Sequence, residues 1–171
     1  MSHDYTIRRA TLADIPHLLH HRRAMFVEIG NSEEEIAPTI EAARLYLDWA
    51  LADGSCRAWV AVHRASVIGG GFIVFAHWPA VPGSGKPCRP WILNVYVEPA
   101  FRRRGIARAL METMIQHCRE ENFPFVSLHA SDLGRPLYEQ MGFLPTNEMR
   151  LDLWPSRTAP TALSASIKSR S

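Results

Sequence analysis

The residues Arg102 to Ala107, with the sequence RRRGIA, place three arginines and a glycine directly after an apolar run. The run Trp91 to Val97 is typical of a buried strand, and an amphipathic segment follows to about Glu121. A helix N-terminus carries unpaired backbone N–H groups and the positive end of the helix dipole, so it attracts an anion. Gly105 allows the backbone to approach a phosphate without an intervening Cβ. The arginines add fixed positive charge, so the pattern predicts a site for a phosphate-bearing cofactor.

The arginine turn does not match two common nucleotide-binding patterns. A Walker loop needs G-x-x-x-x-G-K-[S/T], and the chain contains no such string. The dinucleotide pattern G-x-G-x-x-G follows none of the apolar runs. The turn does contain R-x-x-G-x-A, with Arg102, Gly105 and Ala107 in the defined places. Taken alone, this string also fits a solvated basic turn that caps an ordinary helix, and that alternative stays open.

A second motif follows about one strand and one helix later in the chain. The segment from Ser131 to Phe143, SDLGRPLYEQMGF, ends in L-Y-E-x-x-G-F. Together with R-x-x-G-x-A, it resembles the signatures of the GNAT N-acetyltransferase superfamily, whose pyrophosphate motif is written Q/R-x-x-G-x-G/A. The predicted order of elements also matches that fold from residue 5 to about residue 153.

The resemblance implies an acetyl-CoA site. In the family, strands four and five splay apart and the pantetheine arm lies in the gap, here between the strands 91–97 and 125–130. A bulge near Asn94 would open the gap. The backbone groups of Val95, Tyr96 and Val97 would pair with the pantetheine amides. Asp132 falls near the place of a family asparagine that contacts the cofactor. The residues expected at the pyrophosphate are Arg102, Arg103, Arg104, Gly105, Ile106, Ala107 and Arg108.

The reaction implied by the resemblance is direct transfer of an acetyl group to a primary amine in a ternary complex. Tyr138 occupies the tyrosine place of the family and suits the role of proton donor, because a phenol stays protonated until the thiolate forms. A backbone N–H near Val95 or Tyr96 would stabilise the carbonyl oxygen. Asn94 is expected to position a water molecule. The structural alternative is that Tyr138 only packs at the end of a short helix.

The general base is not identified by the sequence. A primary amine is mostly protonated at neutral pH and must lose a proton before it attacks. Some family members carry a glutamate on the fifth strand near Ser127, and serine cannot replace it unaided. Glu28, His77 and His129 are candidates by residue type alone, and Glu98 is expected to be solvated beyond the end of its strand.

Hydrophobic periodicity and turn residues predict an α/β fold with a mixed sheet in the order β-α-α-β-β-β-α-β-α-β. The run Gly69-Gly70-Gly71 inside a strand indicates a bulge or the close approach of another backbone or a ligand. The predicted strands are 5–9, 56–63, 67–75, 91–97, 125–130 and 144–153, with a loop at 77–90. The predicted helices are 11–29, a second that begins at Ser32 or Pro38 and ends near Ala52, 105–121 and 134–141.

Length and composition are those of a globular domain. The chain has 171 residues, 47% hydrophobic and 21% charged, which predicts one domain over residues 1–154. The Ser-, Thr-, Ala- and Pro-rich residues 155–171 are expected to form a flexible tail. The formal net charge of +2 argues against a dedicated nucleic-acid-binding protein, which usually shows a strong basic bias.

The number and spacing of the cysteines and the length of the apolar runs indicate the cellular compartment in which the protein is expected. Cys56, Cys88 and Cys118 are far apart and lack C-x-x-C spacing, so neither a disulfide framework nor a zinc site is expected. This agrees with a reducing cytoplasm. We expect no secretory leader and no membrane partner, because no apolar run reaches transmembrane length.

Three histidines, His17, His20 and His21, lie at metal-ligand spacing on one helix. No further ligand is evident, so we predict a polar helix face without metal.

The leading function is an enzyme that acetylates a small-molecule or amino-acid-like amine. A regulatory module of the same fold that binds acyl-CoA without turnover is the alternative. Dimers are common in the resembling family, so a homodimer is also an expectation.

Overall fold

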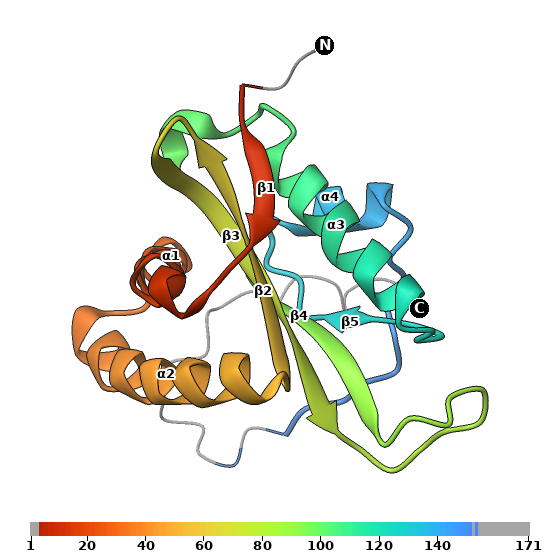
Figure 1. Cartoon of the computed structure of the whole chain (residues 1–171). Coiled ribbons are helices and arrows are strands. Elements are labelled where there is room, and N and C mark those ends of the chain that lie inside the picture. Colours follow the sequence, from red (N-terminus) through yellow and green to blue (C-terminus); the bar gives the residue numbers. More distant parts are fainter. Residues whose placement is uncertain (1–3, 152, 154–171) are drawn as a thin grey trace, which may run out of the picture.

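The computed structural model of the chain describes residues 4–151 and 153. In this part, five strands form one mixed sheet in the order β1-β2-β3-β4-β5 (Figure 1). Helices α1 and α2 cover one face, and α3 and α4 lie on the other side. The predicted mixed α/β fold is confirmed. The strands are β1 (Thr6–Arg9), β2 (Cys56–His63), β3 (Ser66–His77), β4 (Cys88–Val97) and β5 (Ser127–Leu128), and the helices are α1 (Ile15–Glu28), α2 (Glu33–Asp53), α3 (Ile106–Glu120) and α4 (Arg135–Gln140).

Each face of the sheet has its own hydrophobic core. Because both faces are covered by helices, the central strands are apolar almost throughout. The core beneath α1 and α2 includes Leu18, Leu47, Ala58, Val60 and Phe72. The core beneath α3 includes Ile73, Ile92, Leu110, Met111 and Met114.

The entry to α1 is held by a buried carboxylate. Asp14 accepts a hydrogen bond from the backbone N–H of Thr11 at 2.8 Å and is bound by both terminal nitrogens of Arg8 at 2.8 Å. Thr11 and Asp14 thus form a capping box, and the first turn that follows Thr11 is a 3₁₀ helix, Leu12–Asp14. The hydrogen bonds from Arg8, above all, lower the pKa of Asp14 to about 2.

Helix α2 begins at the earlier of the two predicted starts. The hydroxyl of Ser32 accepts from the N–H of Glu35, and the Glu35 carboxylate accepts from the N–H of Ser32. This reciprocal pair satisfies two backbone donors at the helix start. Pro38 consequently lies inside the helix.

Strands β3 and β4 are longer than predicted. His77 pairs with Cys88 at the end of the hairpin, so the connection covers 78–87 rather than 77–90. The N–H of Trp78 donates to the carbonyl oxygen of Pro87 at 3.0 Å and continues the ladder into the loop.

The glycines of β3 lie where neighbouring parts of the chain come closest. A Cβ on Gly69 would be 2.8 Å from the carbonyl oxygen of Tyr96, and a Cβ on Gly70 would be 3.3 Å from Cδ2 of Leu18. The close approach predicted from the glycine run is confirmed, and protein atoms make it.

Strand β4 carries a bulge at Asn94, as predicted. Gly70 pairs with Tyr96 and Phe72 pairs with Leu93, so β4 has one residue more than β3 over this stretch. Asn94 has φ 60°, a left-handed conformation that asparagine tolerates better than most residues. Because of the extra residue, Leu93 and Asn94 both contact the α1/α2 layer.

Strands β4 and β5 stay together over two residue pairs, Trp91 with Ser127 and Ile92 with Leu128. Strand β5 is thus much shorter than the predicted strand 125–130. Beyond Ile92, β4 has no neighbouring strand on this side within the described residues. This is the separation of strands four and five that the sequence predicts.

The predicted last strand, 144–153, is wrong over the described residues, because 144–151 and 153 form neither helix nor strand. Pro145 has no N–H to give to a ladder, and the two-residue strand β5 offers little edge for pairing. Leu144 and Met149 are exposed as a result. The predicted tail, 155–171, lies outside the described residues.

Candidate active site

The turn before α3 presents backbone donors to open space. Arg103 has φ 63° and Gly105, the N-cap of α3, has φ 79°. The first helical hydrogen bond runs from Ala109 N–H to the Gly105 carbonyl, so the N–H groups of residues 106–108 have no partner within the helix. No side chain caps this helix start, and a Cβ on Gly105 would meet no atom within 4 Å. The geometry therefore fits an anion.

The arginines around the turn have different partners. Arg104 donates to the Ala100 carbonyl, and Arg108 donates to Gln140. Arg103 is exposed and has no side-chain partner among the described residues. Arg102 donates from Nε to the carbonyl oxygen of Val97 at 2.9 Å and contacts α1 with its Nη2. Of the three consecutive arginines, Arg102 is the one paired with a carboxylate in the described part of the chain, so Arg103 and Arg104 both keep a charge that no carboxylate neutralises there.

The unpaired side of β4 is formed by Val95 and Val97. The carbonyl of Tyr96 points to Gly69 of β3, and the N–H of Glu98 donates to Ile68 of the same strand. Because backbone groups alternate along a strand, those of Val95 and Val97 point the other way, toward the gap. The backbone of Tyr96 is thus directed away from the gap, unlike the three-residue edge expected from the sequence.

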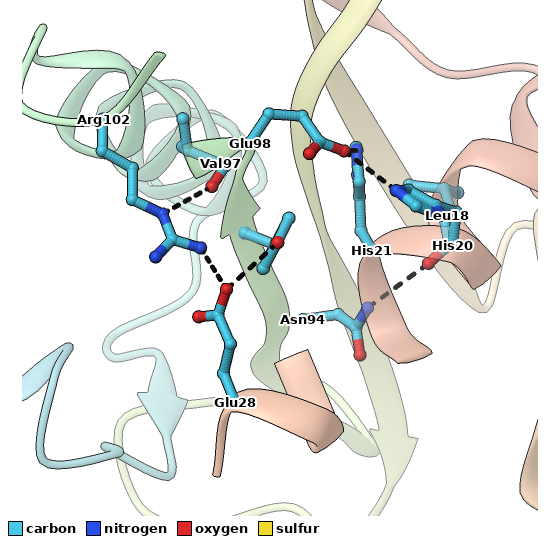
Figure 2. Close-up of polar contacts among 9 residues, drawn as sticks. Leu18, His20, His21, Glu28, Asn94, Val97, Glu98 and Arg102 are labelled. Atoms are coloured by element: carbon cyan, nitrogen blue, oxygen red, sulfur yellow. Dashed lines mark hydrogen bonds and ion pairs between the residues drawn. The ribbon is translucent and has the colours of Figure 1, made fainter. Parts of the chain in front are cut away.

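Glu28, at the end of α1, joins the arginine turn to the sheet. Its Oε1 accepts from the Tyr96 hydroxyl at 3.2 Å and from Nη2 of Arg102 at 2.5 Å (Figure 2). Burial and the Glu28 charge raise the pKa of Tyr96. The second carboxylate oxygen, Oε2, has no partner among the described residues.

A second polar group lies between α1 and the end of β4. Figure 2 shows Glu98 facing His20 and His21, with its Oε1 at 3.1 Å and 3.4 Å from their Nε2 atoms. Burial lowers the pKa of His21 to about 4, and His20 and His17 act in the same direction. His21 is therefore neutral near pH 7 and suited to donate from Nε2. Two expectations are corrected: Glu98 contacts both histidines instead of being solvated, and His21 is buried instead of lying on a polar face.

Asn94 connects the bulge to α1. Its Oδ1 accepts from Nη1 of Arg22 at 3.0 Å, and its Nδ2 lies 3.5 Å from the carbonyl oxygen of Leu18. The side chain is buried, and each end of its amide contacts α1. It therefore connects the bulge of β4 to this helix.

Tyr138 lies on α4, which follows β5. It is partly buried against the α3-side core, with its ring edge-on to Phe143. Burial raises the pKa of Tyr138, so the phenol stays protonated at neutral pH. Asp132 is exposed in the turn before α4 and makes no side-chain contact with the described residues.

Of the three base candidates named by residue type, Glu28 is the one that contacts the arginine turn within the described residues. His129 stacks on Trp91 and lies 3.5 Å from Glu148, and His77 is at the far end of β3 beside Cys88. The hairpin end of β4, beside His77, is opposite to the end that leads into the arginine turn. His129 directly follows Leu128, where the pairing of β4 with β5 ends.

A hollow of 530 Å³ lies elsewhere, between the β1–β2 edge and the second half of α3. It begins at Glu112, well beyond the uncapped first turn of the helix. Its lining residues are Arg9, Trp59, Glu112, Thr113, Gln116, His117 and Glu120.

Within residues 4–151 and 153, no group of three His, Cys, Asp or Glu side chains is placed to hold a metal ion. No helix in this part of the chain is long and apolar enough to cross a bilayer.

Similarity to known proteins identifies the family. The acetyltransferase (GNAT) family profile matches residues 18–143, well over half of the chain. The chain belongs to the acetyltransferase (GNAT) family. The match includes both sequence motifs, so the resemblance to the GNAT family is confirmed.

Solved structures and curated relatives agree with the GNAT assignment. A GCN5-related N-acetyltransferase from Ralstonia eutropha JMP134 is 35% identical over 87% of this chain and 98% of its own, with a TM-score of 0.82. A predicted acetyltransferase from Clostridium acetobutylicum, solved with acetyl-CoA, is 27% identical over 90% of this chain and 99% of its own, with a TM-score of 0.79. Human N-acetyltransferase 8 is 29% identical over 104 residues, 59% of this chain, and the match spans 44% of that protein.

Sequence reasoning missed two features of the GNAT site. Arg22 follows Leu18 by four residues and precedes Met25 by three, which is the spacing of an inward helix face. A charged residue, Arg22, at an inward position of this helix was the signal that could have marked it as a candidate site residue. The contact of Glu98 with His20 and His21 joins residues almost 80 positions apart, so no local sequence pattern predicts it.

Proposed function

We propose that the protein transfers an acetyl group from acetyl-CoA to a small-molecule primary amine, directly and in a ternary complex. The observation that carries the proposal is the uncapped start of α3. Its N–H groups at residues 106–108 lie in front of the open Gly105 turn. In the same strand–turn–helix unit, Val95 and Val97 line the gap and pair with no neighbouring strand there within the described residues.

The residues at the turn fit the charged part of acetyl-CoA. Uncapped helix N–H groups and a nearby free arginine, Arg103, are groups that proteins use to bind phosphates. The backbone of Val95 and Val97 offers the donors and acceptors that an extended amide chain needs. Asp132, exposed before α4, is a further proposed contact. Acetyl-CoA, when bound, supplies an acetyl group activated as a thioester.

Two groups of the chain serve the reacting atoms in this proposal. The N–H of Val95, which faces the gap just after the bulge, donates to the thioester carbonyl oxygen. Tyr138 donates its phenolic proton to the departing thiolate as the new C–N bond forms and the C–S bond breaks. Asn94 acts through the bulge that orients the Val95 backbone.

We assign Glu28 as the base that receives the amine proton. Its Oε1 is fixed by Tyr96 and Arg102, while Oε2 is free among the described residues. The side chain is 31% exposed, so water or an incoming amine can reach it. A fixed carboxylate with one open oxygen suits proton abstraction, directly or through a water molecule.

A regulatory module that binds acyl-CoA without turnover is the second candidate. The ion pair between Arg102 and Glu28 favours it, because it gives the carboxylate a structural role that needs no turnover. A panel of primary amines, assayed for CoA release with acetyl-CoA, separates the candidates. Tyr138-dependent transfer to any amine supports the enzyme, and binding without transfer supports the module.

The proposal also includes a cytoplasmic setting and a homodimer. Cys56, Cys88 and Cys118 are free thiols, in agreement with a reducing compartment. Light scattering of the purified chain measures its oligomeric state.

A further inference from the structure

Arg22 is a half-buried cation on the face of α1 that packs against the sheet. Its Nη1 donates to Oδ1 of Asn94 at 3.0 Å, and its guanidinium lies 4.6 Å from the ring centre of Phe26. Burial lowers the pKa of Arg22, but an arginine stays charged in proteins. The positive charge is therefore held in a half-buried position.

No carboxylate neutralises Arg22 within the described residues. Its polar contact is the neutral amide of Asn94, and its buried Nε has no hydrogen-bond partner there. The neighbouring arginine differs, since Arg23 is exposed and pairs with Glu33 at 2.7 Å. Buried charges in proteins are normally paired because an unpaired one is costly. Arg22 thus keeps donors available for an anion that the chain does not provide.

The position of Arg22 places that anion beside the proposed reaction centre. Asn94 is the bulge residue, two positions beyond Ile92, where pairing of β4 with β5 ends. Helix α1 lies on the opposite face of the sheet from α3, so Arg22 is on the other side from the turn assigned to the pyrophosphate. An anion bound at Arg22 would therefore be a group of the acetyl acceptor and not the pyrophosphate of acetyl-CoA.

We propose that Arg22 binds the carboxylate of the acetyl acceptor, and that the acceptor is an aminocarboxylate rather than a simple amine. The proposal rests on the proposed acetyltransferase function and deepens it. A guanidinium offers parallel donors that match a carboxylate. Asn94 and Phe26 hold it from two sides, and Glu28, two turns further along α1, receives the amine proton.

Matched acceptor pairs test the proposal. The pairs are phenylalanine with phenethylamine, leucine with isoamylamine, lysine with cadaverine, and 4-aminobutyrate with propylamine. We expect the carboxylate-bearing member of at least one pair to have a kcat/KM about tenfold higher or more, the size of one charge-assisted contact.

The variant Arg22→Gln removes the charge while keeping an N–H donor for Asn94. We expect it to lose the carboxylate preference, mainly through a higher KM, and to bind acetyl-CoA as the wild type does. Arg22→Lys should recover part of the preference because it keeps the charge. Arg23→Gln is the matched control and should behave as the wild type.

The outcomes separate this inference from the proposed function. If amines are acetylated with no preference for a carboxylate, or if Arg22→Gln slows both members of a pair equally, the role of Arg22 is refuted and the acetyltransferase proposal stands. If no pair is acetylated although acetyl-CoA binds, the transfer proposal fails and the acceptor site fails with it.

Discussion

Arg102 donates from Nε to the carbonyl oxygen of Val97 over 2.9 Å. That carbonyl belongs to the side of β4 that faces the gap, where the proposed amide chain of the cofactor would pair. The first arginine of the R-x-x-G-x-A motif is therefore bound to the strand edge rather than directed at the helix start. The other end of its guanidinium meets Glu28, so one side chain links the turn, the gap and α1.

Replacement of Glu28 tests its role as the base. We expect Glu28→Gln to reduce kcat by about 100-fold, the lower range for general base catalysis, with acetyl-CoA affinity unchanged. Glu33→Gln, at the exposed pair with Arg23, is the control. Wild-type turnover in Glu28→Gln would exclude this base.

Replacement of Tyr138 tests the proton donor. Because the hydroxyl protonates the leaving thiolate only during reaction, Tyr138→Phe should lower kcat by about 100-fold and leave acetyl-CoA affinity within about twofold. Steady-state kinetics and calorimetry on the same preparation measure the two quantities. Equal kcat in the variant and the wild type would leave Tyr138 with packing alone.

The ion pair between buried Asp14 and exposed Arg8 predicts a pH-dependent stability. The pKa of Asp14 is lowered from 3.8 to about 2, so the folded state holds this proton less tightly than the unfolded state. The stabilisation, about 2 kcal/mol from the shift, is present above pH 4 and is lost as the pH falls toward 2. Asp14→Asn should lower the free energy of unfolding by about this amount at pH 7. Urea denaturation of the wild type and Asp14→Asn at pH 7 and pH 2.5 measures this difference in the free energy of unfolding. A difference that is as large at pH 2.5 as at pH 7 would contradict the role of the ionised Asp14.

The close packing of α1 and β3 at Gly70 leaves little room for a side chain at this position. A Cβ there would lie 3.1 Å from the carbonyl oxygen of Trp59 and 3.3 Å from Leu18. Gly70→Ala should therefore destabilise the fold by about 1–3 kcal/mol through overpacking. Gly85→Ala, with no atom within 4 Å of the new Cβ, should leave the free energy of unfolding nearly unchanged. Thermal unfolding of the two variants measures the effect, and equal midpoints for Gly70→Ala and Gly85→Ala would contradict the close packing at Gly70.

Local patterns predicted most of the fold. The apolar runs, the Ser32 cap and the glycine run are properties of neighbouring residues, and each marks an element or contact that the structure contains. The strand predicted at 144–153 failed for a non-local reason, because a strand needs a partner edge and β5 provides only two residues.

The candidate site was predictable only in part. The arginine turn follows from a motif close in sequence, and the bulge at Asn94 follows from the family resemblance. The partners of Glu28, Glu98 and Arg22 depend on how α1 crosses β4, which brings together residues about 70 positions apart. Pair contacts at such separation leave no periodic pattern in a single chain.

The anion site at the start of α3 is the central claim, and acetyl-CoA binding to Gly105→Glu tests it most directly. A glutamate there adds a negative charge and a side chain at the proposed pyrophosphate position. Gly83→Glu is the matched control, because Gly83 is also left-handed with no atom within 4 Å of its Cβ position. Both variants should share a left-handed strain of about 1–2 kcal/mol.

Calorimetric titration with acetyl-CoA, with CoA and ATP as comparison ligands, is the measurement. The account predicts that the wild type and Gly83→Glu bind acetyl-CoA well above ATP, and that Gly105→Glu remains folded but binds acetyl-CoA at least about tenfold more weakly. Undiminished acetyl-CoA affinity in Gly105→Glu, or no acetyl-CoA binding by the wild type, would contradict the account.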